Sequence, residues 1–203
     1  MGQEIAGLNV SRETLERLET YERLLHKWNP AINLVSKNTL ADAWTRHIAD
    51  SAQIFSMAPS AKIWADLGSG GGFPGMVVAI LAAELNPDQE TVLVESDQRK
   101  SVFLRTVARE TGVKARVLSE RIEQVPALNA DVLSARALAS LTDLLGFAEL
   151  HLAQDGVALF PKGENFQTEI DHALETWRFD VQKLPSATDS GAVVLKIKGL
   201  SRV

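Results

Sequence analysis

A glycine-rich turn is the first part of this sequence whose residues could hold a small molecule. It follows an apolar run and reads Asp66-Leu67-Gly68-Ser69-Gly70-Gly71-Gly72-Phe73-Pro74-Gly75. Alternating glycines allow a sharp turn and leave room for a ligand beside the backbone, and a helix that starts after the turn offers free N–H groups. The spacing predicts a cradle for a nucleoside.

A carboxylate stands at the end of the next predicted strand. Glu95 lies 29 positions after Asp66, and a carboxylate there can accept hydrogen bonds from both hydroxyls of a ribose. The order of strand, glycine turn, helix, strand and acid favours a class I methyltransferase that uses S-adenosylmethionine. We expect Gly68 and Gly70 to line that cofactor, and Asp66 either to hold the turn or to approach the methionyl amine.

A dinucleotide is the competing ligand, since G-x-G-x-x-G also occurs at Gly70, Gly72 and Gly75. That string begins inside the turn and places Phe73-Pro74 where a pyrophosphate would have to approach. No histidine or lysine stands in a context suited to hydride transfer. An NAD-binding oxidoreductase is therefore the least favoured function.

The elements that must position these residues alternate between strand and helix. Short apolar runs predict strands at 62–67, 91–95, 114–118, 130–135, 156–160, 179–183 and 193–197, with helices at 75–84, 98–111, 140–152 and 164–177. This alternation is typical of a parallel sheet covered on both faces. Residues 184–191 are rich in Pro, Ser, Thr, Asp and Gly, which predicts a hairpin and a reversed last strand.

Two helices are expected before the first strand. Ser11 is suited to cap a helix that stops at Asn29-Pro30, and a second helix begins near Asn38 and ends before Pro59. The predicted fold is α/β, a Rossmann-like class I S-adenosylmethionine-dependent methyltransferase with a seven-stranded, mostly parallel sheet. We assign residues 1–60 to an N-terminal helical extension packed on the core, and residues 61–203 to the methyltransferase domain.

The composition excludes several kinds of chemistry. With 203 residues, 45% hydrophobic and 23% charged, the chain fits one soluble domain without a bilayer-spanning run or a secretion signal. We expect a cytoplasmic protein with no membrane partner. The absence of cysteine excludes disulfides, thiolate metal sites, iron-sulfur clusters and a cysteine nucleophile. The four histidines lack ligand spacing, so we expect no metal.

The charges are unevenly distributed along the chain. The net charge of −5 argues against a polyanionic partner, yet seven basic and only two acidic residues lie between Arg99 and Arg121. This segment predicts either a basic face on an acidic protein or a solvated helix flank. Composition alone leaves RNA binding open.

Several segments together resemble the ribosomal small subunit methyltransferase G family, also called the glucose-inhibited division protein B family. They are Trp28-Asn29-Pro30, Asn33-Leu34-Val35, Arg46-His47-Ile48-Ala49-Asp50-Ser51, the turn from Asp66 to Gly75, Glu95-Ser96 with Arg99-Lys100 and Phe103-Leu104, Arg136-Ala137 with Ala139-Ser140-Leu141, and Val194-Leu195-Lys196. The resemblance covers nearly the whole chain, and R-H-x-x-D-S combined with G-x-G-F-P-G is its most specific part. The sequence departs from the family at Ala135, where a serine is usual.

The resemblance implies transfer of a methyl group to N7 of one guanine in 16S ribosomal RNA, near the decoding region. It also implies cofactor contacts at Gly68, Phe73, Ile122, Glu123 and Arg136. From the residues alone, Ile122 and Glu123 follow the third strand, where they could read an adenine or simply form a capped turn. Arg136 follows the fourth strand at the ligand-binding edge of the sheet, where it can hold a carboxylate or a phosphate.

The expected chemistry needs no general base, because guanine N7 carries a lone pair and no proton. We therefore predict no single indispensable catalytic residue, and placement of N7 against the methyl group as the main task. Candidates for phosphate contact are Arg46, His47, Arg99, Lys100 and Lys162. The alternatives are that His47 is a packed, hydrogen-bonded histidine and that the basic residues are merely solvated.

Two other functions stay open from the sequence. One is a methyltransferase that acts on a non-ribosomal acceptor, and the other is an RNA-binding protein that retains the fold without catalysis. On the favoured reading the partner is 16S rRNA, either in the small ribosomal subunit or in an assembly intermediate. We expect the protein to be a monomer.

Overall fold

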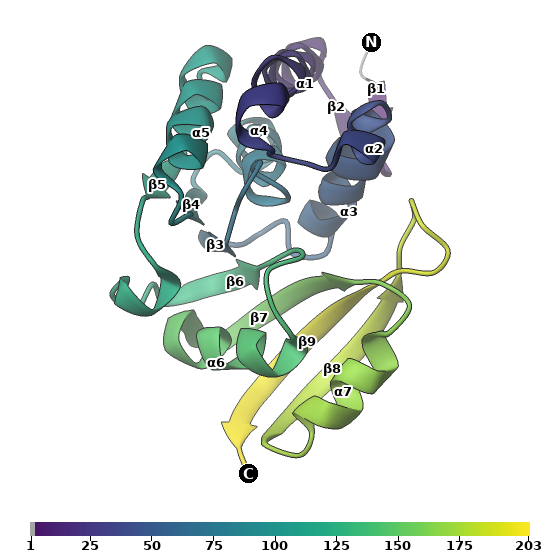
Figure 1. Ribbon diagram of the computed structural model, residues 1–203, viewed down its shortest axis with the longest axis vertical. Coiled ribbons are helices and arrows are strands. Elements are labelled where there is room, and N and C mark those ends of the chain that lie inside the picture. Colours follow the sequence, from purple (N-terminus) through teal and green to yellow (C-terminus); the bar gives the residue numbers. More distant parts are fainter. Residues whose placement is uncertain (1–2) are drawn as a thin grey trace.

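A sheet of seven strands forms the middle of the molecule (Figure 1). The structure, a computed structural model, describes residues 3–203. The strands lie in the order β5 (Arg116–Leu118), β4 (Glu90–Val94), β3 (Ile63–Leu67), β6 (Ala130–Ser134), β7 (Leu152–Lys162), β9 (Val193–Arg202) and β8 (Trp177–Pro185). All seven predicted strands are present, and β7, β8 and β9 extend beyond the predicted ranges.

The first five strands in this order are parallel, and β9 is the reversed one. It pairs antiparallel with both β7 and β8, so the predicted hairpin and reversed last strand are confirmed. In the parallel part, Asp66 lies opposite Leu93 of β4 and Ser134 of β6. The carboxyl ends of these strands meet at one edge, where open α/β sheets bind ligands.

Helices cover both faces of the sheet. Successive side chains of a strand point to opposite faces, so neighbouring residues pack against different helices. Leu93 belongs to one hydrophobic cluster, while its neighbours Val92 and Val94 belong to the other. The first cluster includes residues of α4 (Gly75–Leu85) and α5 (Gln98–Thr111), and the second includes residues of α6 (Leu141–His151) and α7 (Phe166–Ala173). The predicted α/β layering is confirmed, although α7 is shorter than predicted.

The sequence predicts two helices for the N-terminal segment, but in the structure its described part does not begin with a helix. A hairpin of β1 (Gln3–Ile5) and β2 (Leu8–Val10) comes first, and its strands are too short to produce a recognisable alternation. α1 (Arg12–Ile32) begins after the predicted cap Ser11, whose side chain accepts from the Thr14 N–H, but it does not stop at Pro30. Near a helix end Pro30 removes only one hydrogen bond, and the helix ends instead at Asn33, which has a left-handed φ of 48°.

The segment predicted to form a second helix does not form one continuous helix. It consists of α2 (Lys37–Leu40), the π-helical turn η1 (Trp44–Ala49) and α3 (Asp50–Ser56), which ends before Pro59 as expected. The apolar spacing of Trp44, Ile48 and Phe55 does not distinguish a π turn from an α turn. Such turns occur frequently at functional sites, and this one carries His47.

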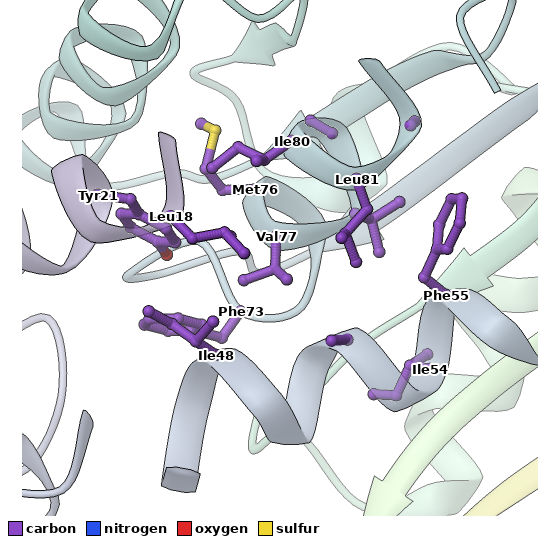
Figure 2. Packing of buried hydrophobic residues seen from close by; sticks show 14 of the residues in the cluster. Leu18, Tyr21, Ile48, Ile54, Phe55, Phe73, Met76, Val77, Ile80 and Leu81 are labelled. Carbon is purple, nitrogen blue, oxygen red and sulfur yellow. The ribbon is translucent and has the colours of Figure 1, made fainter. Parts of the chain in front are cut away.

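The N-terminal helices share one hydrophobic core with the helices that cover the sheet (Figure 2). Leu18 and Tyr21 of α1 pack beside Met76 of α4, and Phe55 of α3 packs against Trp64 of β3, with ring centroids 6.3 Å apart. Burial of this apolar surface fixes α1 and α3 against α4 and β3. None of the helices in the described part of the chain combines the length and apolar character needed to cross a bilayer.

Candidate functional site

A cleft of ≈ 1020 Å³ opens at the carboxyl edge of the sheet. Residues that follow β3, β4, β5 and β6 line it together with residues from the N-terminal helices and from the β8–β9 loop. Its lining includes the predicted cofactor residues Gly68, Gly70, Phe73, Glu95, Ile122, Glu123 and Arg136. Asp66 lies behind this lining.

The glycine turn adopts backbone angles that glycine tolerates best. Gly68, Gly70 and Gly72 have φ values of 61°, 54° and 96°. A Cβ atom on Gly70 would meet nothing nearer than 3.7 Å, so the backbone there leaves space for a ligand. The Ser69 N–H donates to the Val94 carbonyl over 3.0 Å, which holds the turn against the end of β4.

Glu95 joins the glycine turn to the end of β4. Its Oε2 accepts from the Gly70 N–H at 2.8 Å, and its Oε1 accepts from the Asp97 N–H at 2.7 Å. A carboxylate has about four acceptor positions, so each oxygen can still accept one hydroxyl. The turn and Glu95 therefore fit the ribose and backbone contacts of a bound nucleoside.

Asp66 supports the turn from behind. The side chain is fully buried, and its Oδ1 accepts from the Ser134 hydroxyl at 2.7 Å. Its Oδ2 has no hydrogen-bond partner among the described residues. Burial raises the pKa of Asp66 to about 6, although the Ser134 hydrogen bond opposes this rise. Of the two roles considered for Asp66, this position fits holding the turn better than approaching an amine.

Phe73 lies at the centre of a cluster of rings. Tyr21 of α1 stacks on it with centroids 5.2 Å apart, and His47 of η1 stacks on it at 5.0 Å. The guanidinium of Arg136 lies 5.1 Å from the Phe73 centroid, within cation–π range. Phe73 thus connects the glycine turn to the N-terminal helices.

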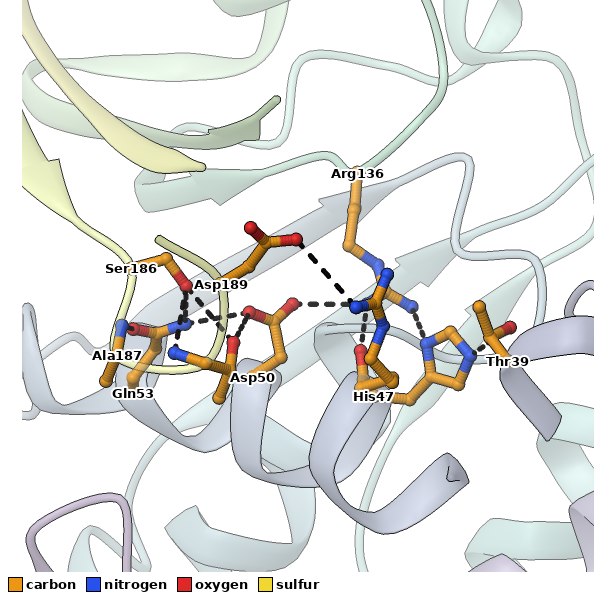
Figure 3. Close-up of polar contacts among 10 residues, drawn as sticks. Thr39, His47, Asp50, Gln53, Arg136, Ser186, Ala187 and Asp189 are labelled. Carbon is orange, nitrogen blue, oxygen red and sulfur yellow. Dashed lines mark hydrogen bonds and ion pairs between the residues drawn. The ribbon is translucent and has the colours of Figure 1, made fainter. Parts of the chain in front are cut away.

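Arg136 is held by residues of the R-H-x-x-D-S segment (Figure 3). Its Nη1 lies 3.3 Å from Asp50 Oδ2 and also donates to the Arg46 carbonyl at 3.3 Å. Its Nη2 donates to His47 Nδ1 at 3.0 Å. Only 18% of the Arg136 side chain is exposed, so these contacts fix its guanidinium at the wall of the cleft.

His47 is a packed and hydrogen-bonded residue in this structure. Because arginine can only donate, His47 Nδ1 is the acceptor, and Nε2–H donates to the Thr39 hydroxyl over 2.9 Å. Burial and the nearby Arg136 and Arg46 lower the pKa of His47 to about 4. The ring is therefore neutral near pH 7 and carries no charge to attract a phosphate.

The predicted adenine-side residues form a short turn after β5. Ile122 and Glu123 begin the 3-10 helix η2 (Ile122–Gln124), and both line the cleft. The Ile122 carbonyl accepts from Nε2 of His151, which is fully buried at the end of α6. His151 was not predicted to belong to the site, because 29 residues separate it from Ile122.

The residues predicted to contact RNA do not all line the cleft. Arg46, His47, Lys100 and Lys162 line the cleft, whereas the lining described within residues 3–203 does not include Arg99. Arg99 pairs with Asp97 at 3.2 Å, and its side chain is 70% exposed. Lys162 is only 10% exposed and pairs with Glu169 at 2.7 Å, so a phosphate would have to compete with that carboxylate.

The basic segment from Arg99 to Arg121 is partly neutralised. Besides Arg99, two of its arginines form ion pairs: Arg109 with Glu110 at 2.9 Å and Arg116 with Glu90 at 3.4 Å. Lys100 and Arg121 are the members of the segment that line the cleft. Arg105 and Lys114 have no ion-pair partner among the described residues and lie outside the cleft, so positive charge remains both at the cleft and along the segment.

Three further residues of the site were not assigned a role from the sequence. Tyr21 donates a hydrogen bond to the Gly71 carbonyl, and Asp50 and Gln53 bind the β8–β9 loop. Asp50 is the acid of the R-H-x-x-D-S segment, but its partners Arg136 and Thr188 lie 86 and 138 residues away, so these contacts could not be read from the sequence. No group of three or more potential metal ligands occurs in the described residues.

Comparisons with known proteins identify relatives of this chain. The sequence profile described as rRNA small subunit methyltransferase G matches residues 14–193. A ribosomal RNA small subunit methyltransferase G from Ruegeria sp. (strain TM1040) is 59% identical over 196 residues, which cover 97% of this chain and 96% of the relative. The protein of the same name from Rhodospirillum centenum is 49% identical over 197 residues, with coverage of 97% and 89%.

Solved structures agree on the fold. A methyltransferase from Geobacter sulfurreducens has a TM-score of 0.59 and 14% identity, with 91% of this chain and 90% of that chain covered. A mutant of MtNAS in complex with S-adenosylmethionine has a TM-score of 0.60 and 14% identity, with 91% and 72% covered. Together with the sheet order, these similarities confirm the predicted class I fold.

Proposed function

This chain belongs to the rRNA small subunit methyltransferase G family, and from that membership we propose that it methylates N7 of one guanine in 16S ribosomal RNA. The methyl donor is S-adenosylmethionine. The observation that carries the proposal is the glycine turn, with Glu95 hydrogen-bonded to Gly70 at 2.8 Å in the wall of the cleft. Within that cleft a nucleoside and an RNA base can meet.

The residues of the cleft suit the cofactor. Glu95 accepts the ribose hydroxyls, and the Gly68 to Gly70 backbone approaches the nucleoside closely. The η2 turn at Ile122 and Glu123 borders the adenine. The guanidinium of Arg136, fixed by Asp50 and His47, holds the methionyl carboxylate. Together these residues would hold the donor in the cleft.

The reaction depends more on correct placement of N7 against the methyl group than on acid or base catalysis. When bound, S-adenosylmethionine would supply an activated methyl group to the N7 lone pair, and its sulfur would keep the electron pair of the S–C bond. No proton moves in this step. The chain contributes alignment and exclusion of water, and orientation of this kind is worth roughly 7 to 11 kcal/mol of the barrier. His47 is a weak base, because its pKa is lowered to about 4 and its Nδ1 lone pair already accepts from Arg136, and this agrees with a site that requires no base.

The partner is ribosomal RNA, and we place the reaction inside the cell on the small subunit or an assembly intermediate of it. The test is transfer of tritiated methyl from S-adenosylmethionine to small subunits from a strain that lacks this protein. Subunits from the parent strain and naked 16S RNA serve as controls, followed by nucleoside analysis. Label in the deficient subunits as 7-methylguanosine supports the proposal. Cofactor binding without label on any of the three overturns the assigned substrate.

A further inference from the structure

Selection of guanine over adenine cannot come from the reacting atom, because adenine also carries a lone pair at N7. The two purines differ on the Watson–Crick edge. Guanine presents an N1–H and a 2-amino group as donors beside the O6 acceptor, whereas adenine presents an acceptor at N1. Enzymes that act on a single base read this edge by hydrogen bonds. A carboxylate, which only accepts, distinguishes guanine from adenine there.

The cleft extends well beyond the cofactor residues. Besides the predicted cofactor residues, its lining includes residues of α2, η1 and α3, of the end of β7, of Gly163 and α7, and of the β8–β9 loop, namely Thr39, Arg46, His47, Asp50, Lys162, Gly163, Glu169, Ser186, Thr188 and Asp189. If the nucleoside lies against Glu95 and η2, the acceptor base enters from this side. We refer to these ten residues as the acceptor side.

Three carboxylates lie on the acceptor side, and two of them already have strong partners. Asp50 accepts from Arg136, Gln53 and Thr188. Glu169 accepts from Lys162 Nζ and the Leu141 N–H through the same oxygen. Asp50 is therefore committed through both oxygens, whereas Glu169 is held by Lys162 and Leu141 through Oε2 alone and its Oε1 has no hydrogen-bond partner among the described residues.

Asp189 has more free acceptor capacity than these two. Its Oδ1 accepts from the Gly191 N–H at 3.0 Å, and its Oδ2 lies 3.9 Å from Arg46 Nη1, too far for a hydrogen bond. The side chain is 47% exposed, so a base can reach it. Arg46 beside it adds donors that match the O6 acceptor.

The loop that carries Asp189 is fixed to the N-terminal helices (Figure 3). The Ala187 N–H donates to Gln53 Oε1 at 2.8 Å, and the Thr188 hydroxyl donates to Asp50 Oδ1 at 2.7 Å. The Gln53 amide also donates to the Ser186 hydroxyl at 3.2 Å. A carboxylate on a loop held in this way is presented in one position, which selective recognition requires.

We propose that Asp189 is the specificity-determining residue of the acceptor side and accepts hydrogen bonds from N1–H and the 2-amino group of the target guanine. This inference rests on the proposed function. As N7 takes up the methyl group, positive charge develops on the guanine ring and its N1–H becomes a stronger donor. The contact with Asp189 therefore strengthens toward the transition state, which assists catalysis as well as selection.

The experiment combines variants with altered bases. Once the methylated guanosine has been mapped, small subunits are reconstituted with 16S RNA that carries guanosine, inosine or adenosine at that one position. Inosine lacks only the 2-amino group. We expect the unaltered protein to prefer guanosine over inosine by about 10-fold in kcat/KM, the scale of one base-edge contact. Asp189→Ala should reduce this preference to about 1, and Asp189→Asn should lower activity on guanosine more than on inosine.

Two controls make the outcome decisive. Affinity for S-adenosylmethionine should be unchanged in both variants, which shows that the fold and the cofactor side are intact. Asp155→Asn, an exposed carboxylate of β7 outside the cleft, should behave like the unaltered protein. An unchanged guanosine-to-inosine ratio in Asp189→Ala overturns the role of Asp189. Absence of methyl transfer by the unaltered protein to guanosine subunits overturns the proposed function instead.

Discussion

Tyr21 of the N-terminal helix donates a hydrogen bond from its hydroxyl to the carbonyl of Gly71, in the middle of the cofactor turn. Its ring also stacks on Phe73, with centroids 5.2 Å apart. Burial raises the pKa of Tyr21 well above its ordinary value, so the hydroxyl keeps its proton and remains a donor. The N-terminal helix therefore supports the glycine turn, although 50 residues separate the two partners.

Replacement of Tyr21 by phenylalanine should destabilise the protein and weaken cofactor binding. The ring stacking stays, but the Gly71 carbonyl loses its donor in a buried place, which costs about 1 to 3 kcal/mol. Urea unfolding gives the loss of stability, and calorimetric titration with S-adenosylmethionine gives the loss of affinity. Unchanged values in both measurements would show that this hydrogen bond does not hold the turn.

A methyl group at Gly75 should damage the fold. A Cβ there would lie 2.4 Å from Leu93 Cδ2 and 2.5 Å from Asp66 Cβ, so the start of α4 would have to move away from the sheet. We expect Gly75→Ala to lower the free energy of unfolding by about 1 to 3 kcal/mol or more, the scale of overpacking. The matched control is Gly146→Ala in α6, where a Cβ meets nothing within 4 Å. It should stabilise the helix by about 0.5 to 1 kcal/mol, and equal losses from both variants would contradict this explanation.

The sequence predicts the parts of this molecule that depend on local pattern. The glycine turn, Glu95 and the positions of the strands along the chain all follow from short stretches of sequence, and the structure places them as expected. The contacts that join Asp50 and Gln53 to the β8–β9 loop span 133 to 138 residues, and no periodicity encodes such pairings. The β1–β2 hairpin and the π turn at His47 escape prediction for a different reason, since three-residue strands and one wide turn leave no distinctive spacing.

The buried carboxyl of Asp66 should make stability fall as the pH rises. Because burial raises its pKa from 3.8 to about 6 in the folded state, the unfolded chain releases this proton first. Between these pH values unfolding becomes easier, by about 3 kcal/mol in total, and above pH 6 the effect is constant. The check is urea unfolding of the unaltered protein and of Asp66→Asn from pH 4 to pH 7. The free energy of unfolding of the unaltered protein should fall relative to that of Asp66→Asn as the pH rises through this range. A difference that stays constant would mean that the pKa of Asp66 is not raised.

Lys100 should contribute to RNA affinity, and the adjacent Arg99 should not. Lys100 lines the cleft and has no ion-pair partner among the described residues, whereas Arg99 is exposed and paired with Asp97. A basic residue that binds one phosphate contributes about 0.7 to 0.9 to the slope of log affinity against log salt concentration. Lys100→Ala should reduce the slope for binding to small subunits by that amount and weaken binding at low salt.

Arg99→Ala is the matched control, because it removes one positive charge from the same turn of α5. Its slope should stay within error of the unaltered protein, since a cation that is already paired and lies outside the cleft neutralises no RNA phosphate and so releases no counterion from the RNA. Titrations at several salt concentrations between about 50 and 200 mM resolve a change of this size. An equal loss of slope in both variants would show that the RNA follows the outer surface of α5. In that case the path of the phosphates would have to be placed along the basic segment and not through the cleft.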